Sequence, residues 1–339
     1  MKKILYSIIL TLVILAVIGC SSVGGPGTAK IVIYTSMYQY VIDSVKKDLQ
    51  KDFPKYDIEF VYGGTGTLQG RVESERAYGR LGCDILMVAE PTYSIELREQ
   101  GMLHSFKSKE TSNLAFDYDP DGYWYPVRVS NMILAYNPER QSKDSIPNSF
   151  QDFANDSRVS GSIAMRSPLT SGTSLASISA LRDKYGYEYF DSLARQNIQI
   201  EYGSDTPIEK LESGQYKVIM ILEESVLRKR QEGSKLEVIY PEDGTIMIPS
   251  TIMIINNNWS ANSNTGAAEE IADWFLSMKG QGAIVDGWMH SVRTNFPRIP
   301  FESKPTNEIR ANSIAVNWVN HFHQKQEIQE KFQEDLARR

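Results

Sequence analysis

Short apolar runs alternate with amphipathic stretches along most of this chain, and this alternation limits its fold more than any other feature. Three runs have the length of strands, and each precedes a stretch with helical periodicity: 30–34 before 39–53, 58–62 before 68–78, and 84–88 before 92–100. Strands and helices that alternate through short loops predict an α/β fold with a parallel sheet and crossover helices. A second series of this kind begins near Ser162. At roughly 100–200 residues per domain, the 339 residues are enough for two lobes or one large domain.

The N-terminal residues are interpreted as an export signal. Two lysines precede an apolar run at 4–18, which is shorter than the ~20 residues that span a bilayer. The run ends in Val-Ile-Gly before Cys20, which resembles a bacterial lipobox; an uncleaved N-terminal anchor is the alternative. We therefore expect a lipoprotein signal peptide at 1–19, a lipid anchor at Cys20 and a flexible tether at 20–29. The protein would be exported and held on the cell membrane, at its periplasmic or outer face.

Charge, cysteine content and missing motifs exclude several classes of protein. Lys and Arg number 36 against 42 Asp and Glu, and a net charge of −6 is unsuited to binding duplex nucleic acid. With Cys20 lipidated, Cys83 has no intramolecular partner, so we expect no disulfide and a place in the core for Cys83. The chain contains no GxSxG, Walker A, GxGxxG or HExxH motif, and we expect no enzymatic activity and no catalytic cofactor.

Small hydroxyl residues and glycines follow several of the predicted strands. Free N–H groups at a helix N-terminus, supplemented by Ser and Thr hydroxyls, bind anions, and glycine lets an anion approach the backbone. Ordinary N-capping is the alternative at each junction. Because the carboxyl ends of parallel strands form the ligand-binding edge of a sheet, we expect one shared anion site. Its predicted residues are Thr35, Ser36, Thr65, Gly66, Thr67, Ser171, Gly172, Thr173 and Ser204.

Phenol and carboxylate oxygens form a second group at the same strand ends. Tyr38 lies at the first strand-to-helix junction, Glu90 follows the third strand, and Glu223 and Glu224 follow the strand that ends at Leu222. Such oxygens suit a hard cation such as ferric iron, or the amine and hydroxyl groups of an organic ligand. For each glutamate, a place in the first turn of a helix, favoured by the helix dipole, is the alternative. These four residues are the predicted metal ligands.

The order and spacing of these motifs resemble the solute-binding proteins of bacterial ABC importers, in the ferric-iron-binding-like branch of family 1. The motifs that carry the resemblance are Ile33-Tyr34-Thr35-Ser36-Met37-Tyr38, Gly63-Gly64-Thr65-Gly66-Thr67, Cys83-Asp84-Ile85-Leu86-Met87-Val88-Ala89-Glu90, Tyr123-Trp124-Tyr125-Pro126-Val127-Arg128, Tyr136-Asn137-Pro138 and Ser171-Gly172-Thr173. The resemblance implies a two-lobed periplasmic-binding-protein type 2 (Venus flytrap) fold, in which each lobe is a βα sheet and the ligand binds in the cleft between them. It places lobe 1 at 30–127 and 251–300, lobe 2 at 128–250, and a C-terminal helical segment at 301–339.

The resemblance also implies capture of a solute by a monomer and its delivery to a membrane permease and its ATPase. In ferric-binding members, a His or Tyr in the first loop, a Glu after the third strand and a tyrosine pair hold iron, with an anion such as phosphate or carbonate. Tyr38 and Glu90 match the first two, whereas Glu223 and Glu224 stand in the place of the tyrosine pair. We expect ferric iron with its anion as the ligand. The alternatives are an organophosphate, such as a sugar phosphate or phosphonate, and a structural or adhesive surface lipoprotein.

Overall fold

The computed structural model describes residues 28–338. The predicted signal peptide, the lipid-anchor Cys20 and nearly all of the predicted tether therefore lie outside the described residues, and the first strand begins at Ala29. Within the described part of the chain, no helix is both long and apolar enough to cross a membrane.

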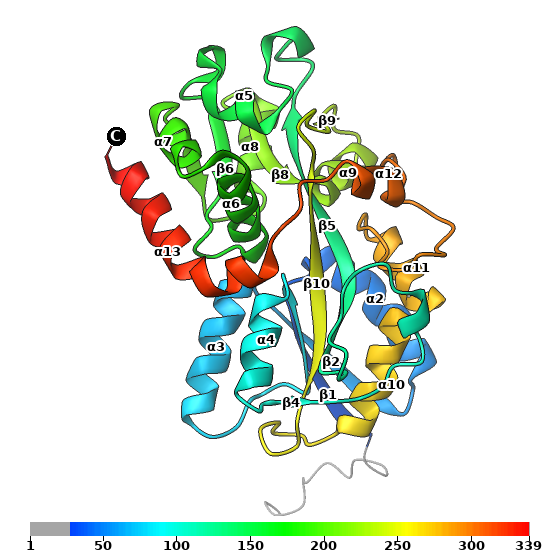
Figure 1. Ribbon diagram of the computed structural model, residues 1–339. Helices are drawn as coiled ribbons and strands as arrows, with labels where there is room; N and C mark the ends of the chain where they lie inside the picture. Colours follow the sequence, from blue (N-terminus) through cyan, green and yellow to red (C-terminus); the bar gives the residue numbers. More distant parts are fainter. Residues whose placement is uncertain (1–27, 339) are drawn as a thin grey trace, which may run out of the picture.

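The first lobe is built from three parallel strands and the helices that follow them, as the sequence predicts (Figure 1). Its strands are β1 (Ala29–Thr35), β2 (Tyr56–Tyr62), β3 (Ile85–Ala89) and the short β4 (Leu103–His104). Its helices are α2 (Gln39–Asp52), α3 (Thr65–Ala77), α4 (Thr92–Glu99), α10 (Thr265–Leu276) and α11 (Met278–Asp286). Helix α3 begins at Thr65 rather than at the expected Leu68, so much of the glycine-rich loop forms its first turn.

The second lobe repeats this construction with its own parallel strands. They are β6 (Ile163–Arg166), β7 (Gln199–Glu201) and β8 (Val218–Leu222), and β9 (Glu237–Ile239) pairs antiparallel with the central strand β5. The helices are α5 (Phe150–Asn155), α6 (Gly172–Tyr185), α7 (Glu188–Arg195), α8 (Thr206–Ser213) and α9 (Glu223–Gln231). Single 3₁₀ turns at Thr111–Asn113, Lys143–Ser145 and Ser157–Val159 lie in connections along the chain.

Two long antiparallel strands, β5 (Trp124–Tyr136) and β10 (Ile246–Ile255), join the lobes into one sheet. The strand order is β2-β1-β3-β10-β5-β8-β6-β7, and Figure 1 shows β5 and β10 running side by side through the centre of the molecule. The β5–β10 pairing shifts register between Ser250 and Thr251, beside Arg128. This bulge lies at the predicted crossing between the lobes.

Separate hydrophobic cores show that the two lobes are packed independently. On β5, Tyr125 and Val127 pack into a core with β1 and β3, whereas Leu134 and Tyr136 pack with β6 and β8. Buried Cys83 is a free thiol in a further core of the first lobe, as predicted. The fold is therefore the two-lobed α/β type that the sequence predicts. The residue boundaries of the lobes stay a prediction, and Val129 and Met247, which it assigns to the second lobe, pack into the core of the first.

The C-terminal segment is not one long helix but two, α12 (Thr306–Ala311) and α13 (Trp318–Ala337). The connection between them is extended because the Ile314 N–H donates to the Thr245 carbonyl (2.7 Å) and Ile314 packs on the second lobe. Helix α13 then packs on α6 and α7 with Phe332 against Phe190, and reaches α4 of the first lobe. It thus spans both lobes on one side of the molecule (Figure 1).

Candidate functional site

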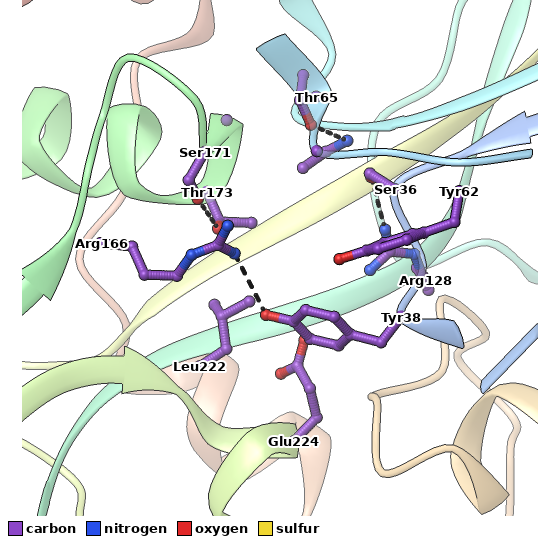
Figure 2. Close-up of a pocket in the computed structure, with 13 residues that line it drawn as sticks. Ser36, Tyr38, Tyr62, Thr65, Arg128, Arg166, Ser171, Thr173, Leu222 and Glu224 are labelled. Atoms are coloured by element: carbon purple, nitrogen blue, oxygen red, sulfur yellow. Dashed lines mark hydrogen bonds between the residues drawn. The ribbon is translucent and has the colours of Figure 1, made fainter. Parts of the chain in front are cut away.

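A small cavity lies between the lobes, where the N-termini of α3 and α6 face each other (Figure 2). It encloses about 370 Å³ of empty space, its open mouth included. That figure counts the space between atoms and the open mouth, so the enclosed part of the cavity is narrow. The residues that line it come from both lobes: Ser36, Tyr38, Tyr62, Gly64, Thr65, Ala89, Arg128, Arg166, Ser171, Gly172, Thr173, Leu222 and Glu224.

Arg128 places a positive charge at the floor of this cavity. It lies on β5, and its side chain is held by hydrogen bonds from Nη2 to the Ser36 hydroxyl (3.0 Å) and from Nη1 to the Ser130 hydroxyl (3.4 Å). The residue is only 4% exposed, and its Nε–H has no hydrogen-bond partner in the part of the chain that the structure describes. Burial lowers the pKa of Arg128, and the nearby Glu224 opposes this shift. A buried guanidinium is still charged and is costly to leave without a counter-charge, so the site is prepared for an anion.

Arg166 supplies a second positive charge from the opposite lobe. It ends β6, and its Nη1 lies 3.5 Å from the Tyr38 hydroxyl, a contact that joins the two lobes (Figure 2). Its buried Nε–H also lacks a hydrogen-bond partner among the described residues. Burial raises the pKa of Tyr38, although Arg166 partly offsets the effect. Tyr38 therefore remains a neutral phenol near pH 7 and can donate a hydrogen bond to a ligand.

Glu224 is the carboxylate of the cavity. It lies in the first turn of α9 and accepts a hydrogen bond from the Ser130 hydroxyl (2.8 Å). Burial raises its pKa from 4.5 to about 7, against the attraction of Arg128. Near neutral pH the side chain therefore exists in both protonation states, so it can accept a hydrogen bond from a ligand hydroxyl or donate one.

Hydroxyl groups and two helix N-termini complete the lining. Ser171 caps α6 by accepting a hydrogen bond from the Ser174 N–H (3.2 Å), and its hydroxyl lies 3.0 Å from that of Thr173. Thr65 accepts a hydrogen bond from the Ala89 N–H (3.2 Å). The alternative of plain N-capping thus holds for Ser171, yet its side chain also lines the cavity. The positive ends of α3 and α6 add to the field of the two arginines.

Several predicted ligand residues lie elsewhere. The hydroxyl of Thr35 is buried and bonded to the Met37 N–H (3.1 Å), Thr67 is exposed, and Ser204 lies in the loop between β7 and α8. Gly66 and Glu90 line a neighbouring cavity that is covered by Lys325 of α13. The Glu90 carboxylate accepts a hydrogen bond from the Thr92 N–H (2.7 Å), and burial raises its pKa to about 7.

Glu223 belongs to a separate buried cluster. Its carboxylate accepts hydrogen bonds from Asn131 (2.8 Å), Ser303 (2.6 Å) and the Tyr240 hydroxyl, and it lies 3.0 Å from His290 Nε2. Burial acts to raise the pKa of Glu223, but the hydrogen bonds and charge of its neighbours outweigh it, and the pKa is lowered. We refer to these five residues as the Glu223 cluster.

The structure does not bring the four predicted metal ligands together. Glu223 and Glu224 are adjacent on a helix, so their side chains leave it about 100° apart and enter different clusters. Glu90 faces the neighbouring cavity, which leaves Tyr38 with Glu224 in the main one. Among the described residues, no group of three or more His, Cys, Asp or Glu side chains could hold a metal ion.

Sequence reasoning missed the two arginines and Tyr62. A signal for Arg128 existed, because it is the one charged residue in the otherwise apolar and polar-neutral run at 123–136. Arg166 directly follows the run at 162–165 that begins the second series, so its place at a strand end was a signal of the same kind as that of the hydroxyl residues. Tyr62 ends β2, and no local pattern distinguishes it from other tyrosines that end strands.

Solved structures share this fold. The periplasmic binding protein AfuA from Actinobacillus pleuropneumoniae, with exogenous fructose-6-phosphate bound, is 19% identical and matches with a TM-score of 0.79, covering 91% of this chain and 98% of its own. Iron-bound HitA from Pseudomonas aeruginosa is also 19% identical, with a TM-score of 0.77 and coverages of 91% and 99%. The apo ferric ion-binding protein A of Pasteurella haemolytica is 15% identical, with a TM-score of 0.71 and coverages of 91% and 98%.

At these identities the structures establish the fold and not the ligand. No curated protein matches the sequence at a significant level. The family of bacterial extracellular solute-binding proteins matches residues 83–320, which is well over half of the chain. The chain therefore belongs to the bacterial extracellular solute-binding protein family.

Proposed function

We propose that this protein is the solute-binding subunit of an ABC importer and that its cleft takes a small organic phosphate. The observation that carries the proposal is the pair of arginines, Arg128 and Arg166, whose buried Nε–H groups have no partner among residues 28–338. Guanidinium groups bind phosphate oxygens through paired, charge-assisted hydrogen bonds. The nearby hydroxyls of Ser36, Ser171 and Thr173 can supply further donors.

The remaining cavity residues suit the organic part of such a ligand. Glu224 can accept a hydrogen bond from a sugar hydroxyl, and the Tyr38 phenol can donate one. The fructose-6-phosphate bound to AfuA supports this ligand class, although the identity is only 19%. Members of such a family bind and release without bond-making chemistry, and we propose the same here: a monomer without enzymatic activity that hands its solute to a permease and its ATPase.

Ferric iron is the second candidate. Tyr38, Tyr62 and Glu224 place three hard oxygen donors around one cavity, and iron-bound HitA supports the same ligand. Two arginines oppose a trivalent cation unless an anion such as phosphate or carbonate lies between them and the metal. We therefore propose the organic phosphate ahead of the ferric iron expected from the sequence, with an anion common to both.

Calorimetric titration of the purified protein with fructose 6-phosphate and with ferric citrate separates the two ligands. We expect heat of binding with the phosphate ester and no visible charge-transfer band with iron. Arg128→Gln should weaken phosphate binding by about 30-fold, since a hydrogen bond to a charged group contributes about 2 kcal/mol. Arg80→Gln, at an exposed site of the first lobe, is the matched control and should bind as the wild type.

Other results would contradict the proposal. A charge-transfer band with ferric citrate, without heat from any phosphate ester, would establish the iron importer instead. If neither ligand raises the melting temperature, the structural or adhesive lipoprotein gains support, because a ligand at 100 times its Kd should stabilise the fold by ~2.7 kcal/mol. Export and lipid anchoring at Cys20 are proposed separately, and a mass spectrum of the N-terminal peptide from membranes tests them.

A further inference from the structure

Three glycines lie where the two lobes touch beside the cavity. A Cβ atom on Gly64 would lie 2.9 Å from the Thr170 carbonyl oxygen, and one on Gly66 would lie 2.9 Å from the Leu169 carbonyl oxygen. A Cβ atom on Gly172 would lie 3.0 Å from the side chain of Thr65. These contacts join the start of α3 in the first lobe to the start of α6 in the second, and we call them the glycine seam.

Backbone conformation does not account for these glycines. None of the three has a positive φ, and Gly64 has φ −60° and ψ 154°, which any residue adopts. Gly66 and Gly172 lie in the first turns of helices, where alanine has the higher propensity. Close approach of the opposite lobe is therefore the physical reason that a side chain is excluded at each position.

The glycine seam forms one wall of the cavity. Gly64, Thr65 and Gly172 line the main cavity, and Gly66 lines the neighbouring one on the other side of the seam. Arg128 lines the same main cavity, and its buried Nε–H has no hydrogen-bond partner among the described residues. The seam brings the positive ends of two helices together next to the two arginines, an arrangement that is repulsive without an anion. Ligand charge and contact between the lobes are thus physically coupled.

We propose that Gly64 and Gly66 are positioning residues that allow the lobes to close over the ligand. Gly66 is one of the residues of the anion site predicted from the sequence, but the role proposed for both glycines is to contact the other lobe and not the solute. A methyl group at either position meets a backbone carbonyl, which cannot turn aside, and holds the lobes apart. A methyl group at Gly172 meets a threonine side chain instead, so its effect should be smaller.

Alanine variants test the inference, which rests on the proposed function only for its ligand. Gly64→Ala and Gly66→Ala should each weaken binding of fructose 6-phosphate by at least 10-fold, chiefly through faster dissociation. Gly172→Ala should have a smaller effect. Gly70→Ala is the matched control, because it lies in the same helix and a Cβ there meets nothing within 4 Å. Wild-type binding by both Gly64→Ala and Gly66→Ala would overturn the inference while leaving the proposed ligand intact.

Oxidative cross-linking gives a readout that needs no ligand. In a Thr67→Cys/Thr170→Cys background, one cysteine lies on each side of the glycine seam, and transient closure is trapped as a disulfide. Cross-linking should be slowed at least 10-fold by Gly66→Ala and unchanged by Gly70→Ala. Equal rates would overturn the inference even if no phosphate ester binds. Circular dichroism melting identifies any variant that fails to fold, and Gly64→Ala then replaces Gly66→Ala in the comparison.

Discussion

Glu223 and Glu224 are neighbours in sequence, yet they belong to two buried regions with opposite properties. The Glu223 carboxylate has bonded neighbours on both oxygens, and its pKa is lowered. Glu224 has a hydrogen bond from Ser130 and faces the cavity, and its pKa is raised to about 7. A carboxylate whose hydrogen bonds are complete stabilises the fold, whereas one that is left incomplete is available to a ligand.

Removal of Glu223 should have the largest effect on stability. Glu223→Ala leaves His290, Asn131 and Tyr240 buried without their common acceptor, and the free energy of unfolding should fall by about 3–5 kcal/mol. Denaturant unfolding monitored by circular dichroism measures the loss. The contrast between a stabilising Glu223 and a ligand-binding Glu224 is wrong if Glu223→Ala is as stable as the wild type. It is also wrong if Glu223→Ala weakens ligand binding while the fold is unaffected.

Glu224→Gln should instead change how stability depends on pH. Because the pKa of Glu224 rises from 4.5 in the unfolded chain to about 7 in the folded one, the folded state binds more protons between these values. The unfolding free energy should therefore fall as the pH rises from about 4.5 to about 7, by about 3 kcal/mol from this group. Glu224→Gln should remove the contribution of this group to the fall in unfolding free energy with rising pH.

A second buried carboxylate outside the main cavity serves as the control for this measurement. Burial also raises the pKa of Glu90 to about 7, so Glu90→Gln should flatten the same part of the stability curve. It should leave ligand binding unchanged, whereas Glu224→Gln should alter it. If the unfolding free energy of Glu224→Gln runs parallel to that of the wild type between about pH 4.5 and pH 7, the pKa of Glu224 is not raised in the folded state.

Ser303→Ala should have the smallest effect. It removes one donor of several from Glu223 (2.6 Å) and leaves the other bonds of the cluster in place. The free energy of unfolding should decrease by about 1 kcal/mol, as for a single hydrogen bond. Denaturant unfolding of Ser303→Ala and Glu223→Ala measures both losses, and the two midpoints can then be compared. A loss as large as that of the glutamate variant would mean that the stability of the Glu223 cluster depends on Ser303 and not on the carboxylate.

The fold could be predicted because its signals are local. The apolar strands and the helices after them follow from periodicity, and Tyr38, Thr65, Ser171 and Thr173 line the cavity because they lie at strand ends. The site could be predicted only in part, since which side chains meet across the cleft depends on how the lobes approach. Glu223 is an example, because nothing in the sequence shows that the distant His290 and Ser303 contact its carboxylate.

Helix α13 has a mechanical consequence for the motion of the lobes. Its contacts with the second lobe include the buried Phe332. Its polar contacts with the first lobe include the partly exposed ion pair between Lys325 and Glu96 (3.1 Å) and the buried approach of His321 Nε2 to the Glu90 carboxylate (3.8 Å). An ion pair of that kind contributes at most about 1 kcal/mol, far less than a buried aromatic ring. When the lobes separate, α13 should travel with the second lobe as a rigid arm. On this flank, opening therefore separates weak polar contacts and leaves the hydrophobic cores intact.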